Sequence, residues 1–278
     1  MKLLKYFSLL AIALLFSCSS DDDNILPINE TEDLILVKNF ENNQHTLSVY
    51  TQNGFFQLGY NKIYFQIKEG ENFVDNAEVT WKPVMHMMST SHSCPYSIVS
   101  RKPNTETLYE GYIVFQMPGN DMENWELTFN YTINGEEFTV SETITVPPSD
   151  KKRVNVFMGS DDERYIVALI EPSDPKVATN DMIAGIFKME NMMNFPRVDN
   201  YTLKIDPRMP SMGNHSSPNN VHLTQSNLDK LYHGKLSLTM TGYWKINLQL
   251  LNANDEVLKG EEVTETNESS SIFFEIEF

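Results

Sequence analysis

Residues 125–138 read Trp-Glu-Leu-Thr-Phe-Asn-Tyr-Thr-Ile-Asn-Gly-Glu-Glu-Phe, and this stretch indicates the fold class. Apolar and polar residues alternate from Trp125 to Ile133, which is the pattern of a half-buried β-strand. The Asn134-Gly135 pair that follows is a strong short-range signal for a β-hairpin, because a tight turn needs residues that tolerate positive φ. The stretch therefore predicts two adjacent antiparallel strands.

Similar short runs occur along the chain beyond residue 30, whereas helical periodicity is scarce. Clear examples are residues 63–67, 112–117 and 245–251, and the last run is followed by turn residues and a further short run at 256–258. Closely spaced strands separated by turn residues predict an all-β fold made of antiparallel, immunoglobulin-like sandwiches.

The chain also contains two similar halves. Pro147-Pro148-Ser149-Asp150 interrupts the strand pattern and separates predicted domains at residues 31–147 and 150–278. The same spaced motif occurs in each half, at His92 and His215, Pro95 and Pro218, Gly111 and Gly234, Met117 and Met240, Gly119 and Gly242, and Trp125 and Trp244. We interpret the chain as a tandem pair of duplicated sandwich domains.

In these residues each half resembles the YtkA-like domain, a small extracytoplasmic β-sandwich family. The family joins a Met- and His-containing segment to a Tyr-x-Gly strand and a Met-x-Gly-x-Trp close. Here the strand and close start at Tyr109 and Met117, and again at Tyr232 and Met240, while extra residues before Trp125 depart from the pattern. FixH-type relatives are associated with copper handling during oxidase assembly, so the resemblance implies a copper-related function.

Two segments gather side chains that suit soft metal ions. Thioether and imidazole groups are ligands for copper, and sulfur favours Cu(I). The candidate metal ligands are His86, Met88, His92 and Met117 in the first half and Met209, Met212, His215 and Met240 in the second. His86 and Met209 stand at equivalent positions, each six residues before the motif histidine.

Structural roles are the alternatives for several of these residues. Met117 and Met240 follow apolar residues at alternate positions, which favours core packing, and His86 and His92 also fit a polar loop. Other residues are assigned to structure alone: Met189, Met192 and Met193 as core filling, Trp81, Trp125 and Trp244 as sandwich cores, and His45 as a surface residue.

The N-terminus predicts export and lipidation. Residues 1–17 carry Lys2 and Lys5 before a short apolar run, which is typical of a signal peptide and too short to span a bilayer. Leu15-Phe16-Ser17-Cys18 resembles a bacterial lipobox, so Cys18 is the expected lipidation site and residues 18–30 form an acidic linker. Asp21-Asp22-Asp23 resembles the export signal of Bacteroidetes surface lipoproteins, which favours display on the outer membrane, with a periplasmic orientation as the alternative.

The charge and the cysteine content argue against two classes of function, nucleic-acid binding and enzymatic catalysis. The chain carries 21 Lys and Arg against 38 Asp and Glu, a net charge of −17, which argues against nucleic acid as a partner. Cys94 stands two residues from His92, but no orienting residue or oxyanion site accompanies it, so no enzymatic activity is expected.

We therefore expect a lipid-anchored, non-enzymatic envelope protein that binds or transfers copper through its Met and His clusters. Its expected partners are the membrane, through the lipid anchor, and either a copper ion or another envelope protein. The alternative is a surface interaction module of two immunoglobulin-like domains with no metal role.

Overall fold

The computed structural model describes residues 29–278, so the predicted signal peptide, Cys18 and most of the acidic linker lie outside the described residues. This part of the chain is built almost entirely of β-strands and contains no α-helix. Accordingly, none of its elements is a long apolar helix that could cross a membrane. The predicted all-β class is confirmed.

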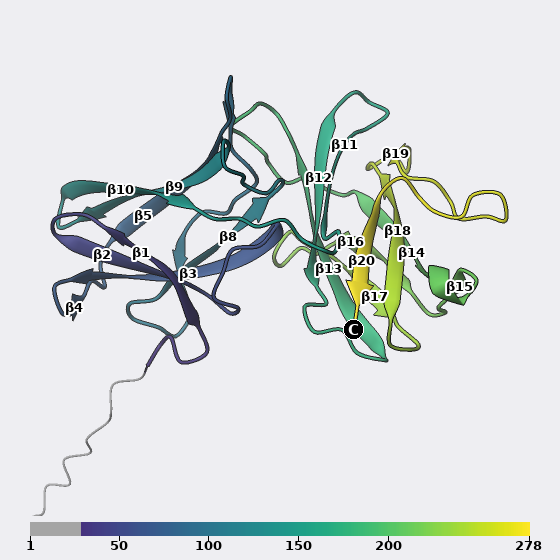
Figure 1. The fold of residues 1–278 in the computed structure, drawn as a ribbon, viewed down its shortest axis with the longest axis horizontal. Helices are drawn as coiled ribbons and strands as arrows, with labels where there is room; N and C mark the ends of the chain where they lie inside the picture. The colour runs from purple at the N-terminus through teal and green to yellow at the C-terminus, as the bar shows by residue number, and fades with distance from the viewer. Residues whose placement is uncertain (1–28) are drawn as a thin grey trace, which may run out of the picture.

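The first half forms two antiparallel sheets (Figure 1). Its strands are β1 (Ile35–Glu41), β2 (His45–Thr51), β3 (Gly59–Glu69), β4 (Asn72–Phe73), β5 (Glu78–His86), β6 (Ser91–His92), β7 (Ser100–Arg101), β8 (Tyr109–Phe115), β9 (Asn124–Ile133) and β10 (Glu136–Ile144). One sheet has the order β1-β2-β3-β8-β7, with β4 beside β3, and the other has the order β10-β9-β5-β6. Strands β2-β3-β8-β7 and β5-β9-β10 correspond to the two sheets of an immunoglobulin constant-type sandwich.

The second half repeats the main strand order of both sheets, without a counterpart of β4. Its elements are β11 (Val154–Met158), β12 (Arg164–Glu171), β13 (Thr179–Lys188), β14 (Thr202–Met209), the 3₁₀ helix η1 (Pro210–Met212), β15 (His215–Ser216), β16 (Val221–Gln225), β17 (Tyr232–Ser237), β18 (Tyr243–Leu251), β19 (Val257–Lys259) and β20 (Phe273–Glu277). The order β11-β12-β13-β17-β16 matches the first sheet, and β19-β18-β14-β15 matches the second. Here β16 also pairs with β14, which joins the two groups into one continuous sheet.

The hairpin predicted from the Asn-Gly pair is present between β9 and β10. Ile133 pairs with Glu136, and Asn134 and Gly135 both adopt positive φ, at 52° and 86°. Residues of β9 alternate between buried and less buried positions, as the sequence pattern predicts.

The tryptophans predicted for the sandwich cores are buried, but two other predictions are wrong: Met192 and Met193, expected as core filling, are 39% and 37% exposed, and His45 is buried. Trp81 is 3% exposed, and Trp125 and Trp244 are fully buried, each within the core of its half. His45, expected on the surface, is only 4% exposed because it begins the inward-facing set of β2. Its Nδ1 lies 3.2 Å from the Tyr131 hydroxyl, which satisfies the buried ring.

The repeated tyrosines have the same structural role in both halves. The Tyr109 hydroxyl donates to the carbonyl of Ala77 at 3.1 Å, just before β5. The Tyr232 hydroxyl donates to the carbonyl of Val198 at 2.8 Å, shortly before β14. Each tyrosine therefore fixes the segment that enters a strand on the other side of its sandwich core.

The repeated tryptophans also act alike. The indole N–H of Trp125 donates to the Met117 carbonyl at 2.9 Å, and that of Trp244 donates to the Met240 carbonyl at 3.0 Å. Each bond satisfies a polar atom of a buried ring and holds the segment that follows β8 or β17. The motif thus has an architectural role that involves the methionine backbone.

Gly111, a repeated residue, is required by close packing. A Cβ at this position would lie 2.5 Å from Cζ2 of Trp81 and 2.8 Å from Oγ of Ser97. Gly111→Ala is expected to lower the free energy of unfolding by about 1–3 kcal/mol, because the buried indole has little room to move. Denaturant titration checks this, with Gly119→Ala as control, since its nearest neighbour would lie at 3.5 Å. Equal stability of the two variants would contradict the packing argument.

Candidate functional site

His92 and Met117 meet at the end of the first sandwich that faces the second half. His92 is placed by the β5–β6 hairpin, in which it pairs with Met85, and its side chain is nearly buried. Met117 follows the end of β8, where the Trp125 indole holds its carbonyl. His92 Nε2 lies 3.3 Å from the Met117 sulfur.

The other ring nitrogen of His92 is already engaged. Nδ1 lies 2.7 Å from the Ser93 carbonyl oxygen and 3.1 Å from Gln116 Nε2, which also donates to that carbonyl at 3.3 Å. With its proton on Nδ1, the neutral ring directs the Nε2 lone pair toward the Met117 sulfur; in the other tautomer Nε2–H donates to that sulfur. A backbone carbonyl beside Nδ1 favours the first tautomer, and such a partner is typical of metal-binding histidines.

These two side chains line a cavity of about 470 Å³ between the halves. Its wall consists of Met87, Thr90, His92, Gln116 and Met117 from the first half and Val156, Arg164, Met189, Met192 and Phe195 from the second. Four methionine thioethers and one imidazole are thus available, no carboxylate belongs to the lining, and Arg164 is exposed. The Gln116 carbonyl oxygen Oε1 is the one buried side-chain polar atom without a hydrogen-bond partner in residues 29–278.

The wall from the second half is held in place by contacts beside the cavity. The Ser93 amide donates to the Met192 carbonyl at 2.8 Å. Nearby, Arg197 Nε donates to the Tyr112 hydroxyl at 2.9 Å. A shared apolar cluster joins β8 to β12 and β13 and includes Val114, Ile166, Phe187 and Phe195.

His86 and Met88, both predicted ligands, do not join this site. His86 is exposed, with Nε2 3.5 Å from a carboxylate oxygen of Glu126 and Nδ1 3.4 Å from Ser91 Oγ. Met88 is 80% exposed. His86 points outward because it follows Met85, which faces the core, and successive strand residues alternate.

The predicted ligands of the second half are dispersed. Met209 is buried in the core, Met212 is 56% exposed on η1, and Met240 packs against the core. His215 is exposed on β15, and no hydrogen bond joins it to Met240 among the described residues. The structure therefore gathers no donor set in this half that corresponds to His92 and Met117.

The predicted equivalence of His86 with Met209 is wrong in register. Met209 pairs with His215 just as Met85 pairs with His92, so Met85 is the counterpart of Met209. The first hairpin is one residue longer, and a shift of one residue moves a side chain to the opposite face of a strand.

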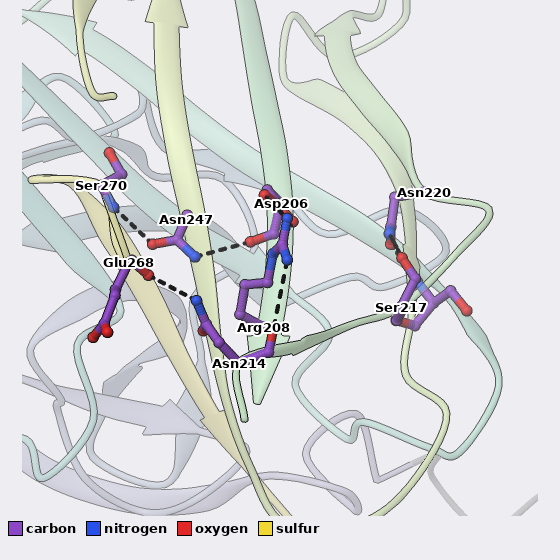
Figure 2. Close-up of polar contacts among 9 residues, drawn as sticks. Asp206, Arg208, Asn214, Ser217, Asn220, Asn247, Glu268 and Ser270 are labelled. Carbon is purple, nitrogen blue, oxygen red and sulfur yellow. Dashed lines mark hydrogen bonds and ion pairs between the residues drawn. The ribbon is translucent and has the colours of Figure 1, made fainter. Parts of the chain in front are cut away.

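In the second half a polar network lies on the face of β14 that points away from the core (Figure 2). Arg208 bonds Asp206 through Nε at 2.8 Å and reaches the Asn214 carbonyl at 3.4 Å, while Asn214 Nδ2 donates to the Glu268 carbonyl at 3.1 Å. Asn247 links Asp206 to a neighbouring loop. Charged and amide groups thus tie this region together.

The sequence interpretation missed Met87, Met189 and Met192 as members of the cavity wall. No three His, Cys, Asp or Glu side chains gather as a possible metal site anywhere in residues 29–278. The groups that do gather are a histidine and thioethers. The sequence signal that could have found them is the density of methionine at positions 85–88 and 189–193.

Comparison with known proteins adds no family assignment. No protein-family model matches the chain, and no curated protein matches it. The resemblance to the YtkA-like domain stays a prediction that rests on the motif residues.

Proposed function

We propose that this chain is a lipid-anchored, non-enzymatic protein of the cell envelope that binds a soft metal ion, Cu(I), at His92 and Met117. The observation that carries the proposal is the 3.3 Å approach of His92 Nε2 to the Met117 sulfur in a nearly buried setting. The lipid anchor and the YtkA-like family are parts of the same proposal and rest on the sequence motifs.

The separation of the two atoms fits a shared ion. A tetrahedral ion with nitrogen at about 2.0 Å and sulfur at about 2.3 Å holds these two atoms roughly 3.3–3.7 Å apart. Without a proton or cation between them, the Nε2 and sulfur lone pairs would repel. His92 and Met117 therefore need little movement to accept an ion.

The chemistry of the wall favours a soft, singly charged ion. Hard cations such as Ca²⁺ and Mg²⁺ take oxygen ligands, and the lining provides no carboxylate. Thioether and imidazole donors suit Cu(I), and neutral donors suffice for its single charge. Arg164 at the cavity also disfavours a multiply charged cation more strongly than Cu(I).

The size of the cavity suits transfer as well as storage. Its volume of about 470 Å³ is far larger than a single ion needs, since a water molecule takes roughly 30 Å³. Met192, on the wall, is 39% exposed, so solvent reaches this donor, while His92 is 7% exposed. A partner protein could insert a donor side chain here and exchange ligands.

Cu(I) titration of the soluble, tag-free chain from residue 19 onward tests the proposal. We expect saturable binding of one ion in competition with a chromogenic Cu(I) chelator. His92→Ala combined with Met117→Leu should weaken binding by about 10- to 100-fold or more, because even outer-shell changes have effects of that size.

His86→Ala combined with His215→Ala is the matched control, since both histidines are exposed and lie outside the cavity wall. This variant should bind Cu(I) as the unsubstituted chain does. Absence of saturable binding, or equal affinity of all three proteins, would rule out the His92–Met117 site.

The interaction module remains the second candidate, and exposed apolar side chains favour it. Ile98 is 87% exposed and Leu228 is 98% exposed. Arg197 lies between their segments, because it lines a cavity with Ile98 and donates to the carbonyl of Asp229, next to Leu228. If the chain does not bind Cu(I), this exposed apolar surface favours the interaction module.

A further inference from the structure

The first half alone cannot supply four ligands to the proposed ion. Soft d¹⁰ ions are commonly held by three or four donors. His92 and Met117 supply two, and the remaining thioether of the first half at the cavity is Met87, which is partly buried beside the β5–β6 turn. A four-coordinate ion therefore needs a donor from the other side of the cavity.

The second half presents thioethers to that cavity. Met189 and Met192 belong to the segment between β13 and β14, and both line the wall opposite His92. The Met192 backbone is fixed to the first half by the bond from the Ser93 amide, one residue from His92. Met189 is positioned by its amide, which donates to the Arg164 carbonyl at 2.9 Å.

The comparison of the two halves supports a role for this junction. The first half has its donor pair at the end covered by the second half, with an unpartnered Gln116 oxygen in the same wall. The second half keeps His215 and Met240, but no equivalent segment covers them and they do not converge. The histidine and methionine donors thus converge only in the half whose donor end is covered by another domain.

We propose that Met189 and Met192 complete a composite Cu(I) site, so that one ion is held between the two sandwiches and bridges them. This inference rests on the proposed function and names the second domain as part of the binding site. Ion binding would then stabilise the domain junction as well as the first half, because the ion contacts both.

The test measures Cu(I) affinity in the full chain after Met189→Leu combined with Met192→Leu. Leucine has a similar volume to methionine and lacks sulfur, so folding should be preserved and only the donors lost. We expect affinity to fall by about 10- to 100-fold. Met193→Leu is the matched control, because Met193 lies in the same turn and is absent from this cavity wall.

Methyl-labelled methionine spectra provide a readout that needs no substitution at the site. Ag(I), a redox-inert soft ion, should shift the methyl resonances of Met189 and Met192 together with that of Met117. Unchanged affinity in the double leucine variant, with no shift of these two methyls, would overturn the composite site. If His92→Ala with Met117→Leu still weakens binding in that case, the proposed function survives alone; if neither variant matters, both ideas fail.

Discussion

Replacing Cys18 by serine should transfer the protein from the membrane fraction to the soluble fraction almost completely. Lipidation is expected at this cysteine because Leu15-Phe16-Ser17-Cys18 follows a positively charged, apolar leader. Each buried methylene contributes about 0.8 kcal/mol, and one short acyl chain anchors a protein only weakly, so durable anchoring needs several chains on the same residue. Cell fractionation and incorporation of an alkyne-labelled fatty acid measure the two effects.

Ser19→Ala is the control for this experiment, because it changes the neighbouring residue and leaves the cysteine in place. It should stay in the membrane fraction and incorporate the label. A Cys18→Ser protein that still sediments with membranes, or an unsubstituted protein without label, would contradict the anchor. Protease treatment of intact cells then separates surface display from a periplasmic orientation.

Local patterns were sufficient to predict the fold class. The alternation in residues 125–133 and the Asn134-Gly135 turn depend on neighbours along the chain, and the structure confirms both. The repeated Tyr and Trp residues were also informative, because each makes the same hydrogen bond in both sandwiches. Burial of these residues follows from a pattern that a single sequence displays.

The candidate site could be predicted only in part, because its contacts are between distant segments. His92 and Met117 were identified from ligand type, but their approach depends on how two opposite sheets end. Met189 and Met192 stand among apolar residues, and this favoured core filling. Their exposure to the cavity follows from the domain junction, which neither local periodicity nor composition specifies.

Register explains the ligands that do not join the site. The sequence places His86 and Met209 at equal distances from the motif histidines, yet a hairpin longer by one residue aligns Met85 with Met209. Equal spacing therefore did not mean an equal direction of the side chain. Such a shift can be found only from strand pairing, because both alignments fit the sequence motif.

The environment of Cys94 leads to a further prediction about reactivity. Its side chain is fully buried, although the residue borders an interdomain cavity of about 490 Å³, and it packs within the core of the first sandwich. Burial raises the pKa of the Cys94 thiol well above its ordinary value, while the backbone contact with Val114 acts in the opposite direction. A buried, protonated thiol reacts poorly, because the thiolate is the nucleophile.

In the Cys18→Ser chain, which keeps Cys94 as its single thiol, alkylation by iodoacetamide should therefore be at least about 10³-fold slower in the folded protein than in guanidinium. Reaction then requires opening of the first core, so its rate should rise with denaturant as this sandwich unfolds. Mass spectrometry of quenched samples measures the modified fraction. A Ser97→Cys variant serves as the accessible control, because Ser97 lines the same cavity and is only half-buried. Rapid modification of Cys94 under native conditions would contradict this prediction. It would mean that the reagent reaches the sulfur through the cavity and that the thiol near His92 is reactive.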